Sequence, residues 1–299
     1  DQDFDPSEQL AVLQYTGGTT GVSKGVMLTH RNMSVNVQQS RAILYSIGAE
    51  PEIFLGLLPF FHIYGLTVNI NFATDCASTI LPLPRFDPLE TLKAIHRFRP
   101  TVFPGTPSVY MALLQQKALP KYDLKSVHYC VSGSAPLPMD VMRRFAEVTQ
   151  AEIIEGYGLS EASPITHLNP LRGKRKQGSI GLPFPDTVAR VAGLSDTGEA
   201  LPPGEPGELL IKGPQVMKGY WNRPEDTAEA LKGGWLHTGD VAVMDEEGYF
   251  FIVDRKKDMI ISGGSNIYPR EVEEVLHEHP KVRDVAAIGV PHRTRGEVI

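Results

Sequence analysis

The first half of the chain alternates short apolar runs with longer amphipathic ones, and this alternation constrains the fold more than any other feature. The apolar runs predict strands at Leu10–Tyr15, Ile53–Leu58, Ser78–Leu83, Thr101–Phe103, Val127–Val131 and Glu152–Ile154. Amphipathic segments that begin on a proline, Pro107–Lys117 and Pro138–Thr149, predict helices between these strands. Alternating strands and helices favour a largely parallel sheet with helices on its faces, so we expect an α/β fold.

A further helix is predicted from its start signal, Asp87-Pro88-Leu89-Glu90. We expect the Asp87 side chain to cap the helix and Glu90 to reach back to the backbone of Asp87. Proline suits the first helical position, because the N–H that it lacks would have no partner within the helix there.

The segments after about Gly178 have a different character, with proline and glycine turns between short apolar runs. Strands are predicted at Thr187–Ala192, Glu208–Lys212, Val241–Met244 and Tyr249–Val253, and Asp245-Glu246-Glu247-Gly248 is interpreted as a hairpin turn. Beyond Asp254, a charged link, a helix from Pro269 to His277 and a strand near Val285–Val290 indicate the opening of a small α+β domain. We therefore divide the chain into an α/β part (1–177), a β-rich subdomain (178–254) and a hinge with the start of a small domain (255–299).

Charge, cysteine content and apolar runs argue against a nucleic-acid-binding protein, a disulfide-bonded protein and a membrane-spanning protein. The chain carries 35 acidic and 29 basic residues, a balance unlike the basic surface of a nucleic-acid-binding protein. The cysteines Cys76 and Cys130 show no metal or disulfide spacing, which fits a reducing cytoplasm. The segment from Ile53 to Thr74 lacks charged residues, but its glycines, asparagines, proline and histidine favour a buried strand, a turn and a buried helix over a membrane span.

The strongest local feature is Tyr15-Thr16-Gly17-Gly18-Thr19-Thr20-Gly21-Val22-Ser23-Lys24-Gly25, directly after the first predicted strand. Glycines let backbone N–H groups approach an anion, hydroxyls donate to phosphate oxygens, and Lys24 adds a positive charge. The alternative is a plain turn, but the density of donors favours a phosphate site. The P-loop pattern fails because Lys24 follows Ser23, and the dinucleotide pattern fails because Gly17 and Gly18 are adjacent.

This segment resembles the phosphate-loop signature of the adenylate-forming (ANL) superfamily, which includes acyl-CoA synthetases, luciferases and peptide-synthetase adenylation domains. Other motifs follow in the family's order over nearly the whole chain. The resemblance implies a large α/β domain with a β-rich subdomain, followed by a small C-terminal lid domain. It also implies that ATP is bound by the loop residues Thr16, Gly17, Gly18, Thr19, Thr20, Gly21 and Lys24, with Thr16 and Lys24 taking part in catalysis.

The segment Glu155-Gly156-Tyr157-Gly158-Leu159-Ser160-Glu161 resembles the family's second signature. The resemblance implies that this segment contacts the nucleotide, with Glu155 and Gly156 beside it and Tyr157 stacked near the adenine. It further implies that Ser160 contacts a phosphate or the acyl-adenylate and that Glu161 helps to hold Mg²⁺, which prefers carboxylate oxygen and substrate phosphates. Serine replaces the threonine that is frequent in the family and keeps the hydroxyl. The alternative is a glycine turn after a strand.

The turn Ser132-Gly133-Ser134-Ala135-Pro136 ends a predicted strand, where open α/β sheets bind ligands. By the resemblance, Ser134 lies against the adenine, although an ordinary strand-to-helix turn would have the same sequence. The segment Gly234-Trp235-Leu236-His237-Thr238-Gly239-Asp240 is similar to the family's T-G-D motif, which implies that Asp240 accepts hydrogen bonds from the ribose. A turn capped by Asp240 is the alternative.

Two later motifs resemble the family's hinge and its coenzyme A tunnel. In Asp254-Arg255-Lys256-Lys257-Asp258, Arg255 would reach the ribose or α-phosphate, and Lys257 would be the position about which the small domain rotates. A charge run is otherwise usually a solvated surface. In Ser262-Gly263-Gly264-Ser265, the glycines Gly263 and Gly264 would contact coenzyme A, and Ser265 stands where many relatives have Glu or an aromatic residue.

His62 matches a family motif near the substrate carboxylate, with a hydrogen-bonded core histidine as the alternative. The basic cluster at Arg172, Lys174, Arg175 and Lys176 is interpreted as a solvated loop. Contact with a membrane surface and a homodimer are left open as alternatives.

The resemblance implies a ligase reaction with small-molecule substrates: a carboxylic acid, ATP with Mg²⁺, and coenzyme A. We expect a medium- or long-chain fatty acid as substrate, with an aryl acid ligase or luciferase-like enzyme as the alternative. Family members carry a longer segment before the phosphate loop and a later catalytic lysine in a P-x-x-x-G-K context, which a scan from Pro269 to Ile299 does not find. We therefore expect a chain with weak adenylation activity, or one that binds nucleotide without turnover.

Overall fold

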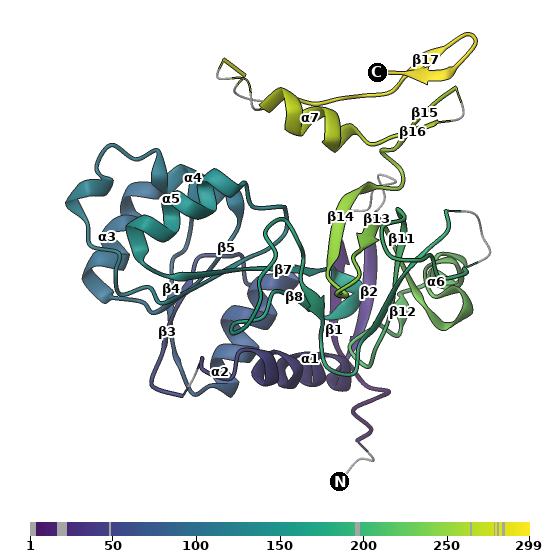
Figure 1. Cartoon of the computed structure of the whole chain (residues 1–299). Helices are drawn as coiled ribbons and strands as arrows, with labels where there is room; N and C mark the ends of the chain where they lie inside the picture. Colours follow the sequence, from purple (N-terminus) through teal and green to yellow (C-terminus); the bar gives the residue numbers. More distant parts are fainter. Residues whose placement is uncertain are drawn as a thin grey trace. The chain divides into compact units, whose positions relative to one another are not determined.

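The computed structural model describes residues 4–16, 23–47, 49–194, 198–263, 265–277, 279, 281–282 and 285–299. They belong to two compact units (Figure 1). Unit 1 comprises Asp1–Val188 and Lys212–Leu236, and unit 2 comprises Ala189–Ile211 and His237–Ile299. Within these described ranges, no helix is long and apolar enough to cross a bilayer.

Unit 1 is built on a seven-stranded sheet in the order β4-β3-β5-β6-β7-β8-β9. The strands are β3 (Ile53–Gly56), β4 (Thr79–Pro82), β5 (Val102–Gly105), β6 (Tyr129–Ser132), β7 (Glu152–Gly158), β8 (Ile165–Leu168) and β9 (Leu182–Pro183). The pairs from β4 to β7 are parallel, and β7, β8 and β9 pair antiparallel. The predicted α/β fold with a largely parallel sheet is therefore confirmed.

Helices cover both faces of this sheet because successive strand residues point to opposite sides. Phe54 and Val131 pack in one core with residues of α1, whereas Leu55 and Cys130 pack in another with residues of α3, α4 and α5. Figure 1 shows α1 and α2 on one side of the sheet and α4 and α5 on the other. The helices of unit 1 are α1 (His30–Ile43), the π-helix η1 (Gly65–Phe72), α2 (Ala73–Asp75), α3 (Pro88–Phe98), α4 (Pro107–Leu114), η2 (Leu119–Lys121), α5 (Met139–Thr149), η3 (Ser160–Ala162), α6 (Pro224–Ala230) and η4 (Lys232–Gly234).

A second, three-stranded sheet of unit 1 consists of β1 (Leu10–Thr16), β2 (Lys24–Thr29) and β12 (Gly219–Tyr220). Strands β1 and β2 pair antiparallel from Leu10↔Thr29 to Thr16↔Lys24. The sequence did not predict β2, which follows the phosphate-loop segment and pairs antiparallel with β1. The first predicted strand therefore lies outside the parallel sheet.

The charge-free segment from Ile53 to Thr74 is a strand, a turn and a helix, as predicted. Strand β3 is largely buried, and η1 buries residues that include Thr67 and Asn69. The Asn69 side chain donates to the carbonyl of Leu55 at 3.0 Å, which satisfies a polar group inside the core.

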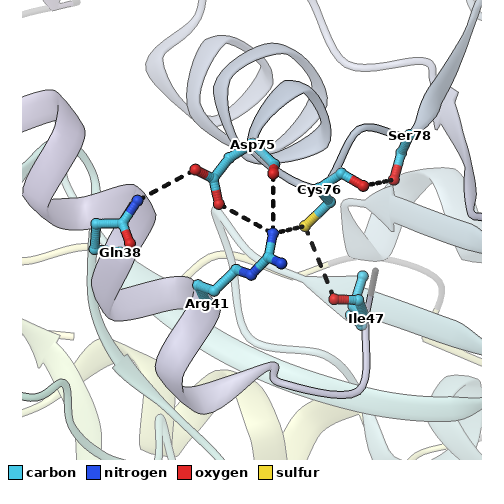
Figure 2. A network of polar contacts seen from close by, with 6 residues as sticks. All are labelled: Gln38, Arg41, Ile47, Asp75, Cys76 and Ser78. Carbon is cyan, nitrogen blue, oxygen red and sulfur yellow. Dashed lines mark hydrogen bonds and ion pairs between the residues drawn. The ribbon is translucent and has the colours of Figure 1, made fainter. Parts of the chain in front are cut away.

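A polar network ties α1 to the end of this helical segment (Figure 2). Arg41 Nη1 donates to the backbone oxygen of Asp75 at 2.9 Å and lies 3.2 Å from its carboxylate. Gln38 Nε2 donates to the other carboxylate oxygen at 3.2 Å, and the Cys76 thiol lies 3.8 Å from the Ile47 carbonyl. Burial raises the pKa of Cys76, so this thiol stays protonated and is a packing group rather than a nucleophile.

The start of α3 differs in part from its prediction. Asp87 Oδ1 accepts from the backbone N–H of Glu90 at 2.9 Å, and Pro88 takes the first helical position, as expected. The Glu90 side chain does not reach back; it accepts from Lys93 Nζ at 2.7 Å, one turn further along the helix. An ion pair along the exposed surface has replaced the second half of the capping box.

Unit 2 holds two four-stranded sheets, in the orders β10-β11-β13-β14 and β16-β15-β18-β17, and the helix α7 (Pro269–His277). The strands are β10 (Val188–Ala192), β11 (Gly207–Lys212), β13 (Leu236–Met244), β14 (Phe250–Arg255), β15 (Ile260–Ser262), β16 (Ser265–Ile267), β17 (Val290–His292) and β18 (Gly296–Val298). The predicted hairpin turn is confirmed, because β13 and β14 pair antiparallel and Asp245 N donates to Tyr249 O at 2.9 Å.

The last predicted strand is wrong in its position. The strand β17 begins at Val290, where it pairs with Val298, and residues 285–289 form no strand. The backbone N–H of Ala287 donates instead to Glu273 of α7 at 2.9 Å. The Glu273 carboxylate thus accepts from a backbone N–H that would otherwise be free to pair with a neighbouring strand.

Candidate functional site

The hairpin of β1 and β2 places Thr16 and Lys24 opposite each other at the end where the phosphate-loop segment joins the two strands. Ser23 Oγ donates to the Thr16 carbonyl at 2.5 Å, which closes this end of the hairpin. The loop contacts predicted at Gly17, Gly18, Thr19, Thr20 and Gly21 lie outside the described residues. The hairpin thus fixes both ends of the predicted phosphate loop. Lys24, the lysine of that motif, lies within the described residues.

Lys24 is held by two side chains that sequence reasoning missed. Its ammonium forms an ion pair with Asp226 of α6 and lies 5.1 Å from the ring centre of Tyr220, over the ring face. Asp226 is 202 positions from Lys24 in the chain, so no local pattern could have indicated the pair. Pairing of β12 with β2, at Tyr220↔Val26, brings the ring into place.

Tyr220 joins Lys24 to the predicted metal ligand. Its hydroxyl donates to Glu161 Oε1 at 2.7 Å. Burial, and next the carboxylate of Glu161, raise the pKa of Tyr220, so the phenol stays protonated and remains a donor. Lys24 and Glu161 come from the two signature motifs, and the structure brings them together around one tyrosine.

The turn that carries Ser160 and Glu161 is anchored by backbone contacts. The Glu161 carbonyl accepts from the Met217 N–H at 2.8 Å, and Ser163 Oγ donates to the Gln215 carbonyl at 2.9 Å. Ser160 begins the short helix η3 directly after β7 and is half-buried. The predicted phosphate contact and the predicted metal ligand are therefore held on one rigid turn.

The ends of β6 and β7 lie next to each other and position the predicted adenine contacts. Glu155 in β7 accepts from the backbone N–H of Leu137 at 2.9 Å, which ties the turn after β6 to β7. Ser134 lies in that turn with a φ of 70°, in the left-handed region. An added Cβ at Gly156 would lie 2.7 Å from Leu168 Cδ1, so a larger residue there would have to displace the Leu168 side chain.

Tyr157 follows in β7, and its ring meets His167 edge-on at 6.0 Å between ring centres. His167 is fully buried, and this burial lowers its pKa from 6.5 to about 3. The imidazole is therefore neutral at physiological pH and supports Tyr157 as an uncharged packing partner.

His62 lies on the segment before η1, close to the β1 strand. Gln14 Nε2 donates to the Phe61 carbonyl at 3.0 Å, so this segment is attached two residues before Thr16. His62 Nδ1 accepts from the Tyr64 N–H at 3.2 Å. The residue is exposed to solvent, but partial desolvation of the imidazole lowers its pKa. The exposed ring differs from the core histidine that was the alternative.

In unit 2, the structure brings Asp240 and Arg255 together. They are paired residues of β13 and β14, with Arg255 Nε 3.6 Å from Asp240 Oδ1. Lys257 lies two residues beyond and is 3.8 Å from the carboxylate of Asp258. Gly263 has a φ of 60° and donates its N–H to the Arg295 carbonyl at 2.7 Å, whereas Gly264 lies outside the described residues.

The basic cluster is only partly a solvated loop. The Arg172 guanidinium lies 5.6 Å from the ring centre of Tyr45, and Arg175 forms an ion pair with Glu152. Through these contacts, Arg172 and Arg175 attach the loop to the rest of unit 1.

The carboxylates suit a metal that arrives with its substrate. No group of His, Cys, Asp or Glu side chains in the described part of the chain could by itself hold a metal ion. Mg²⁺ is commonly bound by one or two carboxylates together with substrate phosphates, and the Glu161 carboxylate is of the type that fits that requirement. Carboxylate, ammonium and hydroxyl groups together match the chemistry of a metal–phosphate ligand.

Comparison with known proteins agrees with this chemistry. Residues 1–221 match the family described as AMP-binding enzyme, and residues 271–299 match the AMP-binding enzyme C-terminal domain. A long-chain-fatty-acid–CoA ligase of Bacillus subtilis (strain 168) is 54% identical over 99% of this chain and 53% of its own length. A feruloyl-CoA synthase of Amycolatopsis sp is 42% identical over 97% of this chain and 58% of its own length.

Solved structures show the same fold. ATP-bound MatB from Rhodopseudomonas palustris superposes with a TM-score of 0.90 at 37% identity, covering 98% of this chain and 57% of that one. The o-succinylbenzoate CoA synthetase (MenE) of Bacillus subtilis with its acyl-adenylate OSB-AMP gives 0.86 at 31% identity, covering 98% and 58%. The chain spans about half the length of the curated relatives that it matches. It belongs to the AMP-binding enzyme family.

Proposed function

We propose that this chain supplies the ATP-binding part of an acid–CoA ligase. A carboxylate oxygen of the substrate attacks the α-phosphorus of ATP, the bond from that phosphorus to the bridging oxygen breaks, and pyrophosphate leaves with its electron pair. The thiol of coenzyme A then loses its proton to solvent and attacks the acyl carbon, the bond from that carbon to the phosphate oxygen breaks, and AMP leaves with the electron pair. Such transfers depend on positioning and charge stabilisation rather than on a nucleophilic side chain.

The observation that carries this proposal is the cluster of Lys24, Tyr220 and Glu161. Lys24 would neutralise the phosphates that leave as pyrophosphate, with Thr16 donating from the opposite strand of the hairpin. Glu161 would hold Mg²⁺, which withdraws charge from the phosphates when it is bound. Ser160 would donate to a phosphate oxygen from the same turn as Glu161.

The remaining assignments extend the nucleotide site. In unit 1, Ser134, Glu155, Gly156 and Tyr157 would surround the adenine, and His62 would lie toward the acid. In unit 2, Asp240 would accept from the ribose hydroxyls, Arg255 would donate to the ribose or α-phosphate, and Lys257 would be the hinge. Gly263 and Gly264 would contact coenzyme A. The chain parts 1–177, 178–254 and 255–299 would correspond to the α/β part, the β-rich subdomain and the hinge with the small domain.

A fatty acid is the proposed substrate, because the Bacillus subtilis relative at 54% identity is a long-chain-fatty-acid–CoA ligase. The feruloyl-CoA synthase at 42% identity favours an aryl acid as the second candidate. Apolar packing against a long acyl chain would supply the affinity in the first case and ring packing in the second.

The test is pyrophosphate release over palmitate, octanoate and ferulate. It uses the chain itself and a chimera in which the chain replaces the matching region of the Bacillus subtilis ligase. We expect the chimera to release pyrophosphate with palmitate and the chain alone to bind ATP with little turnover. A folded chimera that is inactive with every acid would refute the proposal, and a preference for ferulate would refute the fatty acid alone.

A further inference from the structure

A buried carboxylate in unit 2 has no part in the reaction proposed above. Glu208 lies in β11 and is only 6% exposed. A buried carboxylate is costly unless it is paired and hydrogen-bonded. Glu208 Oε1 accepts from the Gly239 N–H at 3.2 Å, and Oε2 accepts from Lys256 Nζ at 2.9 Å, with His237 Nδ1 at 3.4 Å from Oε2.

Both backbone polar groups of Gly239 are hydrogen-bonded. Its N–H donates to Glu208, and its carbonyl accepts from the Lys256 N–H at 2.9 Å. Gly239 has a φ of 73°, a left-handed conformation that glycine adopts without strain. The backbone from Thr238 to Asp240 in β13 is therefore held on one side by the Glu208 carboxylate.

Thr238 fastens the same stretch of β13 to Leu209, the residue after Glu208 in β11. Its hydroxyl donates to the Leu209 carbonyl at 2.8 Å and accepts from the Asp240 N–H at 3.1 Å. Asp240 is the residue after Gly239 and pairs with Arg255, the residue before Lys256. A shift of Gly239 or of Lys256 would thus move both proposed nucleotide contacts.

We infer that Glu208 is a positioning residue, which sets the Asp240 carboxylate for the ribose by fixing the Gly239 peptide and the start of the hinge at Lys256. This inference rests on the proposed ribose contact of Asp240. Glu208 itself is buried in the sheet and acts through the backbone of its neighbours. Loss of its acceptor oxygen should therefore weaken recognition of the ribose hydroxyls and leave other nucleotide contacts unchanged.

The test compares the dissociation constants of AMP and 2',3'-dideoxy-AMP, measured by calorimetry on the chain. Hydrogen bonds to a charged group predict that the wild type binds AMP roughly tenfold more tightly than the dideoxy analogue. Glu208→Met has a similar shape but no acceptor, whereas Glu208→Gln keeps an oxygen for Gly239. The double variant Glu208→Met with Lys256→Met leaves no unpaired charge and protects the test against misfolding.

We expect the affinity ratio to fall to about one in both Met variants, through weaker AMP binding at constant affinity for the analogue, and to be largely retained in Glu208→Gln. A wild-type ratio that persists in folded Glu208→Met or in the double variant would overturn this inference alone. A wild-type ratio of one would overturn the ribose contact of Asp240 and this inference with it. Glu205→Gln, an exposed acid close to β11, is the control and should retain the ratio.

Discussion

Each unit of the chain contains a lysine paired with a carboxylate, and the two pairs differ in burial and in task. In unit 1, Lys24 and Asp226 are partly exposed, at 23% and 29% of their side chains. In unit 2, the Glu208 side chain is 7% exposed and the Lys256 side chain 40%, and Glu208 shares its oxygens between Lys256 and a backbone N–H. The difference lies in the carboxylates, since neither lysine is buried: the Lys256 pair compensates a buried charge, whereas the Lys24 pair joins two partly exposed groups.

The comparison predicts that the same substitution, lysine to methionine, costs more stability in unit 2 than in unit 1. Lys256→Met leaves Glu208 buried without its cation and should lower the free energy of unfolding by about 2 kcal/mol. Lys24→Met breaks a partly exposed pair and should lower it by less than about 1 kcal/mol. Urea unfolding followed by circular dichroism measures both, and equal losses would break the comparison.

Unit 1 should also lose stability in acid, because it contains the buried His167. The pKa of His167 in unit 1 is lowered to about 3, so the folded chain stays unprotonated there while the unfolded chain binds a proton below pH 6.5. Stability is complete above pH 6.5 and falls between pH 6.5 and 3, by about 1.4 kcal/mol at pH 5.5.

Both tryptophans, Trp221 and Trp235, lie in unit 1, so their fluorescence during urea unfolding reports this loss. His167→Gln should show a flatter dependence on pH, whatever its stability at pH 8. An unchanged slope in this variant would assign the acid loss to other groups.

The internal partner of Lys24 should compete with the nucleotide. Asp226→Asn removes the carboxylate that ATP must displace, and we expect ATP to bind roughly fivefold more tightly, about 1 kcal/mol. Glu225→Gln makes the same charge change at an exposed position of α6 and should have little effect. Calorimetry that finds both variants alike would show that Asp226 does not compete.

The smallest effect is expected at the tyrosine between Lys24 and Glu161. Tyr220→Phe keeps the ring beside Lys24 but removes the donor to Glu161, and ATP affinity with Mg²⁺ should fall by about threefold. Affinity without Mg²⁺ should stay constant, because the ring contact remains. Tyr45→Phe, at an exposed tyrosine of unit 1, is the control. An equal fall without Mg²⁺ would show that the hydroxyl does not act through Glu161.

Local patterns predicted the α/β sheet because the signals for a strand or helix lie within about ten residues of chain. Asp87 and Pro88, at the start of α3, are an example. They failed where partners are distant: the sequence did not indicate that β2 pairs with β1 or that Asp226 meets Lys24 across 202 positions. Family motifs indicated Glu161 and Asp240, but not Tyr220 or Glu208, whose tasks arise from strand pairing. A strand near Val285 was predicted wrongly, because Glu273 of α7 takes the Ala287 N–H.

The account depends most on Lys24 as a phosphate ligand, and calorimetric titration of the chain with ATP and Mg²⁺ tests this directly. Charge-assisted contacts to phosphate predict saturable binding in the wild type and a loss of at least about tenfold in Lys24→Met. Lys218→Met, which breaks the exposed pair with Glu8 in the same unit, should retain the wild-type affinity. Equal affinities in wild type and Lys24→Met, or no binding by the folded wild type, would contradict the account.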